Sequence, residues 1–192
     1  MIPAGFEYHR PADLSSAIGI LLEHGDEARV VAGGHSLIPM MKLRMAEVPH
    51  LIDLQDIENL DRIDIDASTI TLGAMVTQHD LICHEGVAAA APILREAALQ
   101  IADPQVRYMG TIGGNVANGD PGNDMPGLMQ CLDATFTLVG SDGERDVPAR
   151  DFYEAAYMTA RDDEEVLTAV SIPMPSGGYA YEKQKRKIGD YA

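Results

Sequence analysis

Two short glycine-rich stretches, VVAGGHSL at residues 30–37 and MGTIGGNV at residues 109–116, decide how this sequence is interpreted. Each places adjacent glycines beside hydroxyl or amide side chains. Glycine lets the backbone adopt positive φ and approach a ligand closely, so that peptide N–H groups can point at an anion. If the two stretches meet in space, they could hold a pyrophosphate from both sides.

Taken singly, each stretch leaves two interpretations open. The first matches neither the GxGxxG fingerprint nor the lysine-containing P-loop, so it indicates either a tight strand-to-helix turn or a phosphate site built from backbone N–H groups and Ser36. The second is followed by a run of glycine, asparagine and aspartate that ends at Asp124. Such a run forms either a surface loop of Asx turns or a ligand site, in which Asp124 could accept hydrogen bonds from ribose hydroxyls.

Composition excludes several classes of protein. The chain of 192 residues is long enough for one large domain or two small lobes. Its formal net charge of −16, from 30 acidic and 14 basic residues, argues against nucleic acid and anionic membranes as partners. We expect no membrane span, because no apolar run approaches about 20 residues. With no signal-peptide pattern, and with only Cys83 and Cys131 as thiols, we expect a cytoplasmic protein whose cysteines are buried and inert.

The pattern of apolar residues predicts a small α/β lobe over residues 1–55. Helical spacing ends at Gly25, a typical helix stop, and Pro39 suits the first turn of a second helix. The expected order is helix, strand, glycine stretch, helix and strand, over residues 12–24, 28–32, 33–36, 39–44 and 50–54.

Residues 56–175 have a different pattern, which predicts a larger α+β lobe with a mostly antiparallel sheet. Residues 176–192 begin a further segment, interpreted either as a solvated tail or as the start of a truncated C-terminal domain. The expected strands of the larger lobe are residues 63–66, 69–74, 135–139 and 165–172, and its expected helices are residues 76–83, 87–101 and 125–132. Residues 146–152 are expected to continue the hairpin after residues 135–139 and to lead into a short helix.

The residue types that usually carry catalysis form no pattern here. His35, His79 and His84 show no metal-ligand spacing and suit ordinary polar or capping roles. There is no Gly-x-Ser-x-Gly elbow and no carboxylate pair that stands out from the acidic background. We therefore expect no catalytic acid, base or nucleophile and no metal site.

The two glycine stretches, in this order and setting, resemble the FAD-binding (medium) subunit of molybdenum hydroxylases, the superfamily of carbon monoxide dehydrogenase and xanthine dehydrogenase. Residues 6–14 are similar to the family's opening, and residues 120–126 continue the match to the second stretch. The resemblance implies the two-lobed PCMH-type FAD-binding fold, of the α+β class, with FAD extended between the lobes. It also implies that the family's C-terminal domain is absent here.

Carried over by position, the resemblance implies that residues 32–36 and 111–115 bind the FAD phosphates and ribityl chain. Asn118 and Asp124 would meet the adenosine end, and Ile101 would pack near the adenine. Leu167 would contact the flavin through its backbone, with Tyr191 and Lys183 near the isoalloxazine. The expected cofactor-binding residues are Ala32, Gly33, Gly34, His35, Ser36, Leu37, Ile101, Thr111, Ile112, Gly113, Gly114, Asn115, Asn118, Asp124, Leu167, Lys183 and Tyr191.

The implied function is that of a flavoprotein subunit in a heteromeric dehydrogenase. It would accept electrons from a [2Fe-2S] small subunit, after a molybdopterin-containing large subunit has oxidised the substrate, and pass them to an external acceptor. Two alternatives stay open. One is a self-contained flavin oxidoreductase of the related superfamily, and the other is a non-catalytic, truncated interaction module.

Overall fold

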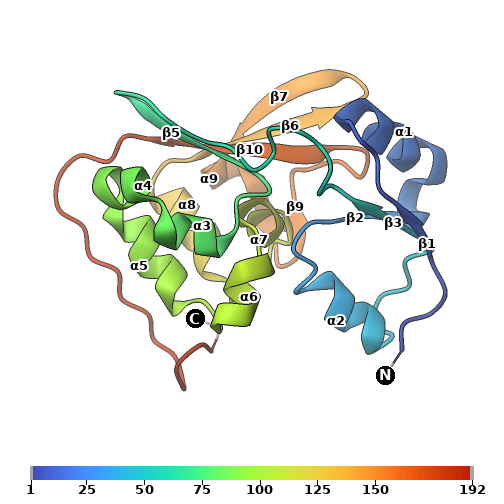
Figure 1. The fold of residues 1–192 in the computed structure, drawn as a ribbon, viewed down its shortest axis with the longest axis horizontal. Helices are drawn as coiled ribbons and strands as arrows, with labels where there is room; N and C mark the ends of the chain where they lie inside the picture. Colours follow the sequence, from blue (N-terminus) through green and yellow to red (C-terminus); the bar gives the residue numbers. More distant parts are fainter. Residues whose placement is uncertain (1, 191–192) are drawn as a thin grey trace.

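The N-terminal part of the chain forms a parallel three-stranded sheet with a helix on each face (Figure 1). The computed structural model describes residues 2–190 of the chain, and this sheet with its helices is the small lobe. Its strand order is β1-β3-β2, and both pairings are parallel, because helical crossovers connect successive strands. The elements are β1 (Glu7–His9), α1 (Leu14–His24), the 3-10 turn η1 (Gly25–Glu27), β2 (Ala28–Val31), α2 (Leu37–Lys42) and β3 (His50–Asp53).

The central strand of this sheet alternates between two small cores. Ile52 packs on the side of α1, while Leu51 packs on the side of α2 with Met41. Helix α1 begins where the Asp13 side chain accepts a hydrogen bond from the Ser16 N–H, and it ends at Gly25, whose φ is 53°. The first glycine stretch therefore leaves the sheet at the carboxyl end of β2 and leads directly into α2.

The rest of the chain forms a large lobe around a five-stranded antiparallel sheet of order β4-β5-β10-β6-β7. Helices cover one face of this sheet (Figure 1), and the largest hydrophobic core lies between them. A two-stranded ribbon, β8-β9, lies apart from it. The strands are β4 (Ile63–Ile65), β5 (Thr69–Gly73), β6 (Thr135–Gly140), β7 (Gly143–Pro148), β8 (Tyr153–Ala155), β9 (Met158–Thr159) and β10 (Val166–Pro173). The helices are α3 (Gln78–Cys83), α4 (Glu85–Ala90), α5 (Pro92–Gln100), α6 (Pro104–Met109), α7 (Ile112–Ala117), α8 (Asp124–Cys131) and α9 (Ala149–Phe152).

The α+β class and the antiparallel sheet agree with expectation, but several elements differ. The helix expected over residues 87–101 is two helices, because Pro92 disfavours helical backbone at Ala91, whose φ is −143°. Helices α6 and α7 and strand β1 were not expected. The prediction of buried cysteines was wrong: Cys83 and Cys131 are exposed at the last residues of α3 and α8.

Beyond β10 the chain runs along the outside of the helical layer towards α6 (Figure 1). Over residues 174–190 it has no regular secondary structure. Among the described residues, no helix is both long and apolar enough to cross a bilayer.

Candidate functional site

A cavity of about 760 Å³ lies between the two lobes and is lined by both glycine stretches. Its volume falls within the range of roughly 300–1,000 Å³ that is typical of small-molecule and cofactor sites. The small lobe contributes β2 and residues 32–37, and the large lobe contributes α7, the start of β10 and part of residues 183–190. Residues of both lobes therefore form the site.

The two glycine stretches touch each other through their backbones. A side chain at Gly33 would collide with the carbonyl oxygen of Met109, and its Cβ would lie 2.7 Å from the Cα of Gly110. Gly34 has a φ of 72°, a conformation that favours glycine. A Cβ at Gly114 would lie 3.3 Å from the Ala32 side chain. These glycines let main chain approach main chain, as the expected two-sided cradle requires.

The second stretch is held in place by contacts to the start of α3. The Ile112 N–H donates to the Val76 carbonyl (2.8 Å), and the Gln78 N–H donates to the Gly110 carbonyl (2.9 Å). The Thr111 hydroxyl accepts from the Gly114 N–H (3.0 Å) and so begins α7, while it keeps a proton to donate elsewhere. Gly113 packs closely on Ala74: a Cβ atom at position 113 would lie 2.6 Å from the Ala74 carbonyl oxygen.

Two side chains on the cavity wall have buried amide atoms that lack hydrogen-bond partners among the described residues. They are Gln78, through both Oε1 and Nε2, and Asn115, through Oδ1. Gln78 is only 1% exposed. Buried amide atoms are nearly always paired, because an unpaired one costs about 1–3 kcal/mol. The cavity therefore presents polar groups that a bound molecule could satisfy.

Asp124, expected to meet a ribose, is already engaged by the C-terminal segment. Its Oδ2 lies 2.7 Å from the Lys183 ammonium, with side chains only 5% and 1% exposed, and its Oδ1 accepts a hydrogen bond from the Tyr181 hydroxyl. Burial, and then the hydrogen bond to Asp124, raise the pKa of Tyr181 above its ordinary value. A ribose hydroxyl would thus have to share this carboxylate with Lys183 and Tyr181.

A second ion pair fixes the start of β10 at the cavity edge. Glu165 is 7% exposed and accepts two hydrogen bonds from Arg145, at 2.6 and 2.7 Å. The side-chain hydrogen bond from Arg145 holds the pKa of Glu165 below its ordinary value. Nearby, burial lowers the pKa of Arg161, which donates to the Glu165 carbonyl (2.8 Å). The pairing positions Leu167 on the cavity wall.

The structure brings together the expected cofactor-binding residues that it describes, with one exception. All of these described residues except Ile112 line the cavity. Ile112 is fully buried in the large core instead, and Tyr191 lies outside the described residues. Gln78 and Arg161 also line the cavity and were not expected there. A Thr77–Asp80 capping box marks the helix start beside Gln78, but no local signal reveals that this side chain faces the cavity.

Geometry alone defines a two-lobed domain whose glycine stretches form a backbone cradle suited to a dinucleotide. The chain belongs to the family described as the FAD binding domain in molybdopterin dehydrogenase, which it matches over residues 4–175. It is similar to the carbon monoxide dehydrogenase medium chain of Afipia carboxidovorans, with 58% identity over all of this chain and 67% of that one. It is also similar to the glyceraldehyde dehydrogenase medium chain of Sulfolobus acidocaldarius, with 36% identity over all of this chain and 68% of that one.

Solved structures show the same relationship. A structure of the Cu,Mo-CO dehydrogenase, in its cyanide-inactivated form, matches with a TM-score of 0.97 and 58% identity, over all of this chain and 68% of that chain. The quinoline 2-oxidoreductase of Pseudomonas putida 86 matches with a TM-score of 0.97 and 37% identity, over all of this chain and 67% of that chain. The two-lobed FAD-binding fold, FAD as the cofactor, and membership of a class of dehydrogenase flavoprotein subunits are thereby established.

Proposed function

We propose that this chain holds FAD as the electron-transfer subunit of a heteromeric molybdenum hydroxylase-type dehydrogenase. In this proposal it receives electrons from a [2Fe-2S] small subunit, downstream of a molybdopterin-containing large subunit, and passes them to an external acceptor. The medium-chain names of the relatives support this role. We also propose a cytoplasmic location, and a division into residues 1–55, 56–175 and 176–192.

The observation that carries the proposal is that Gln78 and Asn115 have buried, unpartnered amide atoms on a cavity that both glycine stretches line. Bound FAD would supply reversible one- and two-electron transfer, which no side chain of this protein can supply. The backbone of residues 32–36 and 111–115 would bind the pyrophosphate. Gln78 and Asn115 would provide directional hydrogen bonds that fix the orientation of the bound molecule.

The other expected contacts complete the proposed binding mode. Ile101 is buried at the cavity wall and would pack against the adenine, with Asn118 and Asp124 at the adenosine end. Leu167, at the start of β10, would contact the flavin through its backbone, and Lys183 would lie close to it. Tyr191 is proposed for the same region. In this binding mode no residue acts as an acid, base or nucleophile, because the subunit positions a cofactor and does not bind the oxidised substrate.

Flavin binding tests the proposal directly. We expect the flavin-free chain to take up one FAD and to retain its visible absorption through gel filtration. Gly114→Val should abolish this uptake, because the new side chain would enter the space between Thr111 and Ala32. Gly127→Val is the matched control, because a Cβ at exposed Gly127 meets nothing within 4 Å and the residue does not line the cavity.

Partner binding separates the proposal from its alternatives. Co-expression with a molybdopterin subunit and a ferredoxin-like subunit should give a complex in which the substrate reduces the flavin without any added dithionite. A chain that binds FAD and turns over substrate without partners would indicate a self-contained oxidoreductase. A chain that assembles with partners but never takes up FAD would indicate an interaction module.

A further inference from the structure

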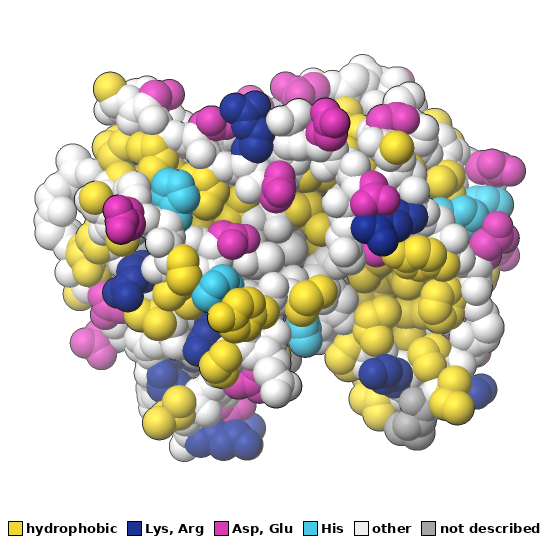
Figure 2. Space-filling model, viewed as in Figure 1, with side chains coloured by type: hydrophobic (Ala, Val, Ile, Leu, Met, Phe, Trp, Pro, Cys, Tyr) yellow, Lys and Arg dark blue, Asp and Glu magenta, His cyan; other side chains and the backbone are white. Residues whose placement is uncertain are grey.

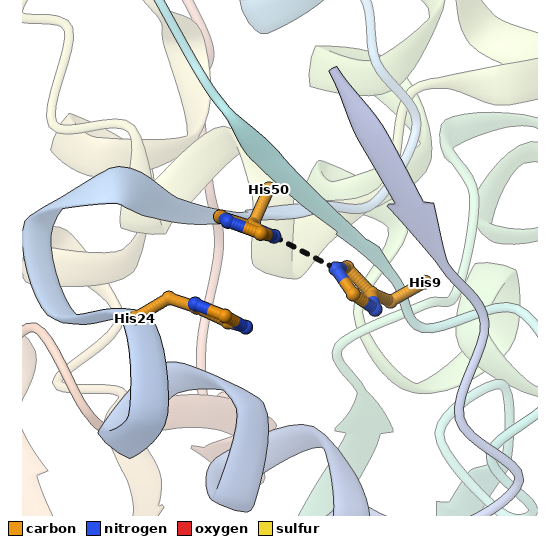
Figure 3. A group of neighbouring side chains, drawn as sticks. All are labelled: His9, His24 and His50. Atoms are coloured by element: carbon orange, nitrogen blue, oxygen red, sulfur yellow. Dashed lines mark hydrogen bonds between the residues drawn. The ribbon is translucent and has the colours of Figure 1, made fainter.

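Three histidines of the small lobe converge outside the lining of the cavity (Figure 3). They are His9 on β1, His24 at the end of α1 and His50 at the start of β3. The Nε2 atom of His9 lies 3.0 Å from the Nδ1 atom of His50, and the rings of His24 and His50 are stacked with centroids 3.6 Å apart. One nitrogen atom from each ring lies within 4.8 Å of the other two. None of the three residues lines the cavity.

The fold itself places these rings on one face. In the parallel pairing of β1 with β3, Glu7 is opposite His50 and His9 is opposite Ile52. Residues at alternate positions of a strand share a face, so all four side chains point to the side on which Ile52 packs against α1. The last residue of that helix is His24, which completes the group. The convergence is therefore set by strand register and by the length of α1.

The spacing of the nitrogen atoms is close to that of a metal-bound set. A zinc–imidazole bond of about 2.0–2.1 Å places two ligands of a tetrahedral ion about 3.4 Å apart. The 3.0 Å separation of His9 and His50 is near this value. The His24 ring is stacked on His50 with an interplanar angle of 8°, so it must rotate out of this stack to direct a nitrogen lone pair at the same ion. All three side chains are partly exposed, which leaves room for that rotation. Neutral imidazole is a preferred ligand of Zn²⁺, Cu²⁺ and Ni²⁺.

The surroundings also favour a cation. The Glu7 carboxylate lies 3.8 Å from the His50 Nδ1 atom and can supply a fourth ligand or bind a water that does so. The carboxyl end of α1, an eleven-residue helix, carries a partial negative charge beside His24. The other three histidines of the described chain belong to no such group: His79, for example, stacks on Tyr108 and has only the Sγ atom of Cys83, at 3.5 Å, as a neighbouring candidate ligand.

We propose that His9, His24 and His50 form a binding site for a divalent transition metal ion of the zinc class, with Glu7 or water as the fourth ligand. The ion would replace the hydrogen bond between His9 and His50 and would tie β1 and the end of α1 to β3. Its role would be structural, because none of the three histidines lines the cavity. The sequence-based expectation of no metal site considered only His35, His79 and His84.

Zinc titration of the full chain tests this site. Calorimetry with ZnCl₂ should show saturable binding of one ion per chain, whether or not FAD is bound. At a free zinc concentration of about 100 times Kd, the Tm should rise by about 5–10 °C. Bound Co²⁺ should give the visible absorption of a tetrahedral, nitrogen-ligated ion, which an ion held only by surface carboxylates does not give.

Matched histidine variants decide the outcome. His24→Ala and His9→Gln should each bind zinc more than about 100-fold more weakly, since loss of even an outer-shell partner typically costs 10–100-fold. His79→Ala should bind zinc as the unaltered chain does. Circular dichroism establishes that each variant is folded, and His24→Asn replaces His24→Ala if the latter is not. The proposal is overturned if zinc binding is absent, or if it persists with unchanged affinity in the folded His24 and His9 variants.

Discussion

At the scale of single residues, Gln78 combines a cost in stability with a benefit in binding. Its buried amide has no partner among the described residues, and this costs about 1–3 kcal/mol. Gln78→Met keeps the shape of the side chain and removes the polar atoms. We expect the free energy of unfolding of the flavin-free chain to rise by about 1–2 kcal/mol, while FAD binds at least about tenfold more weakly. Urea unfolding and a flavin titration measure the two effects.

A second glutamine provides the comparison for this experiment. Gln105 is exposed on α6 and does not line the cavity. Gln105→Met should therefore leave both stability and FAD affinity nearly unchanged. If Gln78→Met lowers stability and leaves FAD affinity intact, Gln78 is a packing residue and its proposed contact with the cofactor is wrong.

Arg145 and Glu165 make a pH-dependent contribution to stability. Hydrogen bonding to Arg145 lowers the folded-state pKa of Glu165 below its ordinary value of 4.5. The contribution is therefore fully present above that pH and is lost as the pH falls through the folded-state pKa. Arg145→Ala should lower the free energy of unfolding by about 1–3 kcal/mol at pH 7, because it leaves a nearly buried acceptor with fewer partners.

This difference should shrink on acidification. Once Glu165 is protonated in both proteins, the charge that Arg145 stabilises is gone, so the two unfolding curves should approach each other below the ordinary pKa of Glu165. Arg62→Ala is a suitable control, since the Arg62–Asp64 pair is well exposed and should contribute little at any pH. A difference between the Arg145 variant and the unaltered chain that stays constant from pH 7 to acid would contradict this assignment.

At the scale of elements, the helices and strands that the sequence predicted are those with a local sequence signal. Elements that depend on contacts between distant segments were missed. The β4–β5 hairpin and strands β2, β3, β6 and β10 were expected because alternation and turn residues are local signals. Helix α7 was not, because two of its six residues are glycines, which are poor helix formers. It is held by distant partners instead: the Ile112 N–H donates to Val76 and the Gly113 N–H to Ala74.

The same division applies to the candidate site. The glycine stretches could be predicted because their composition is unusual over a few residues. The position of Gln78 could not, because it depends on the pairing of Thr77 with Thr111 across a long sequence separation. The histidine group was missed for a similar reason, since parallel strand register brings His9 and His50 together. The two sets of unexpected residues thus share one cause, which is contact between segments far apart in the sequence.

The C-terminal segment, residues 176–190, gives a prediction at this scale. It is attached through the buried Lys183–Asp124 pair and through Lys185, whose ammonium donates a hydrogen bond to the Gln100 Oε1 atom at 2.6 Å. Lys183→Met leaves the Asp124 carboxylate without its cation, and detachment of the segment would return that carboxylate to water. We expect thermolysin to cleave within residues 176–190 at least about tenfold faster, with far-UV circular dichroism unchanged.

Lys187→Met tests whether any lysine in the segment has this effect. Lys187 is exposed, and its replacement should leave the cleavage rate unchanged. If Lys183→Met instead lowers the midpoint of urea unfolding without faster local cleavage, the segment unfolds together with the large lobe. In that case the segment is an integral part of the large lobe and does not detach from it separately.

At the scale of the whole molecule, net charge opposes the proposed ligand. The chain carries a formal charge of −16, and acidic side chains are spread over the face shown in Figure 2, with lysines and arginines among them. FAD is itself an anion through its two phosphates. The glycine stretches bind through backbone dipoles at short range, but at longer distances the field of the protein repels the approaching molecule. Short-range affinity and long-range repulsion therefore act in opposite directions.

Salt screens the long-range repulsion more than the short-range binding by backbone dipoles, so a change in ionic strength separates the two effects. Raising the salt from about 0.01 M to about 0.15 M shortens the Debye length from roughly 30 Å to roughly 8 Å. We expect the association rate constant for FAD, measured by stopped-flow quenching of flavin fluorescence, to rise by about two- to tenfold over this range. Riboflavin has the same ring system and no phosphate, so its association rate should not change. If the rate for FAD falls with salt instead, a local cluster of cations such as Arg29, Arg161 and Lys183, all on the cavity wall, steers the anion in spite of the net charge.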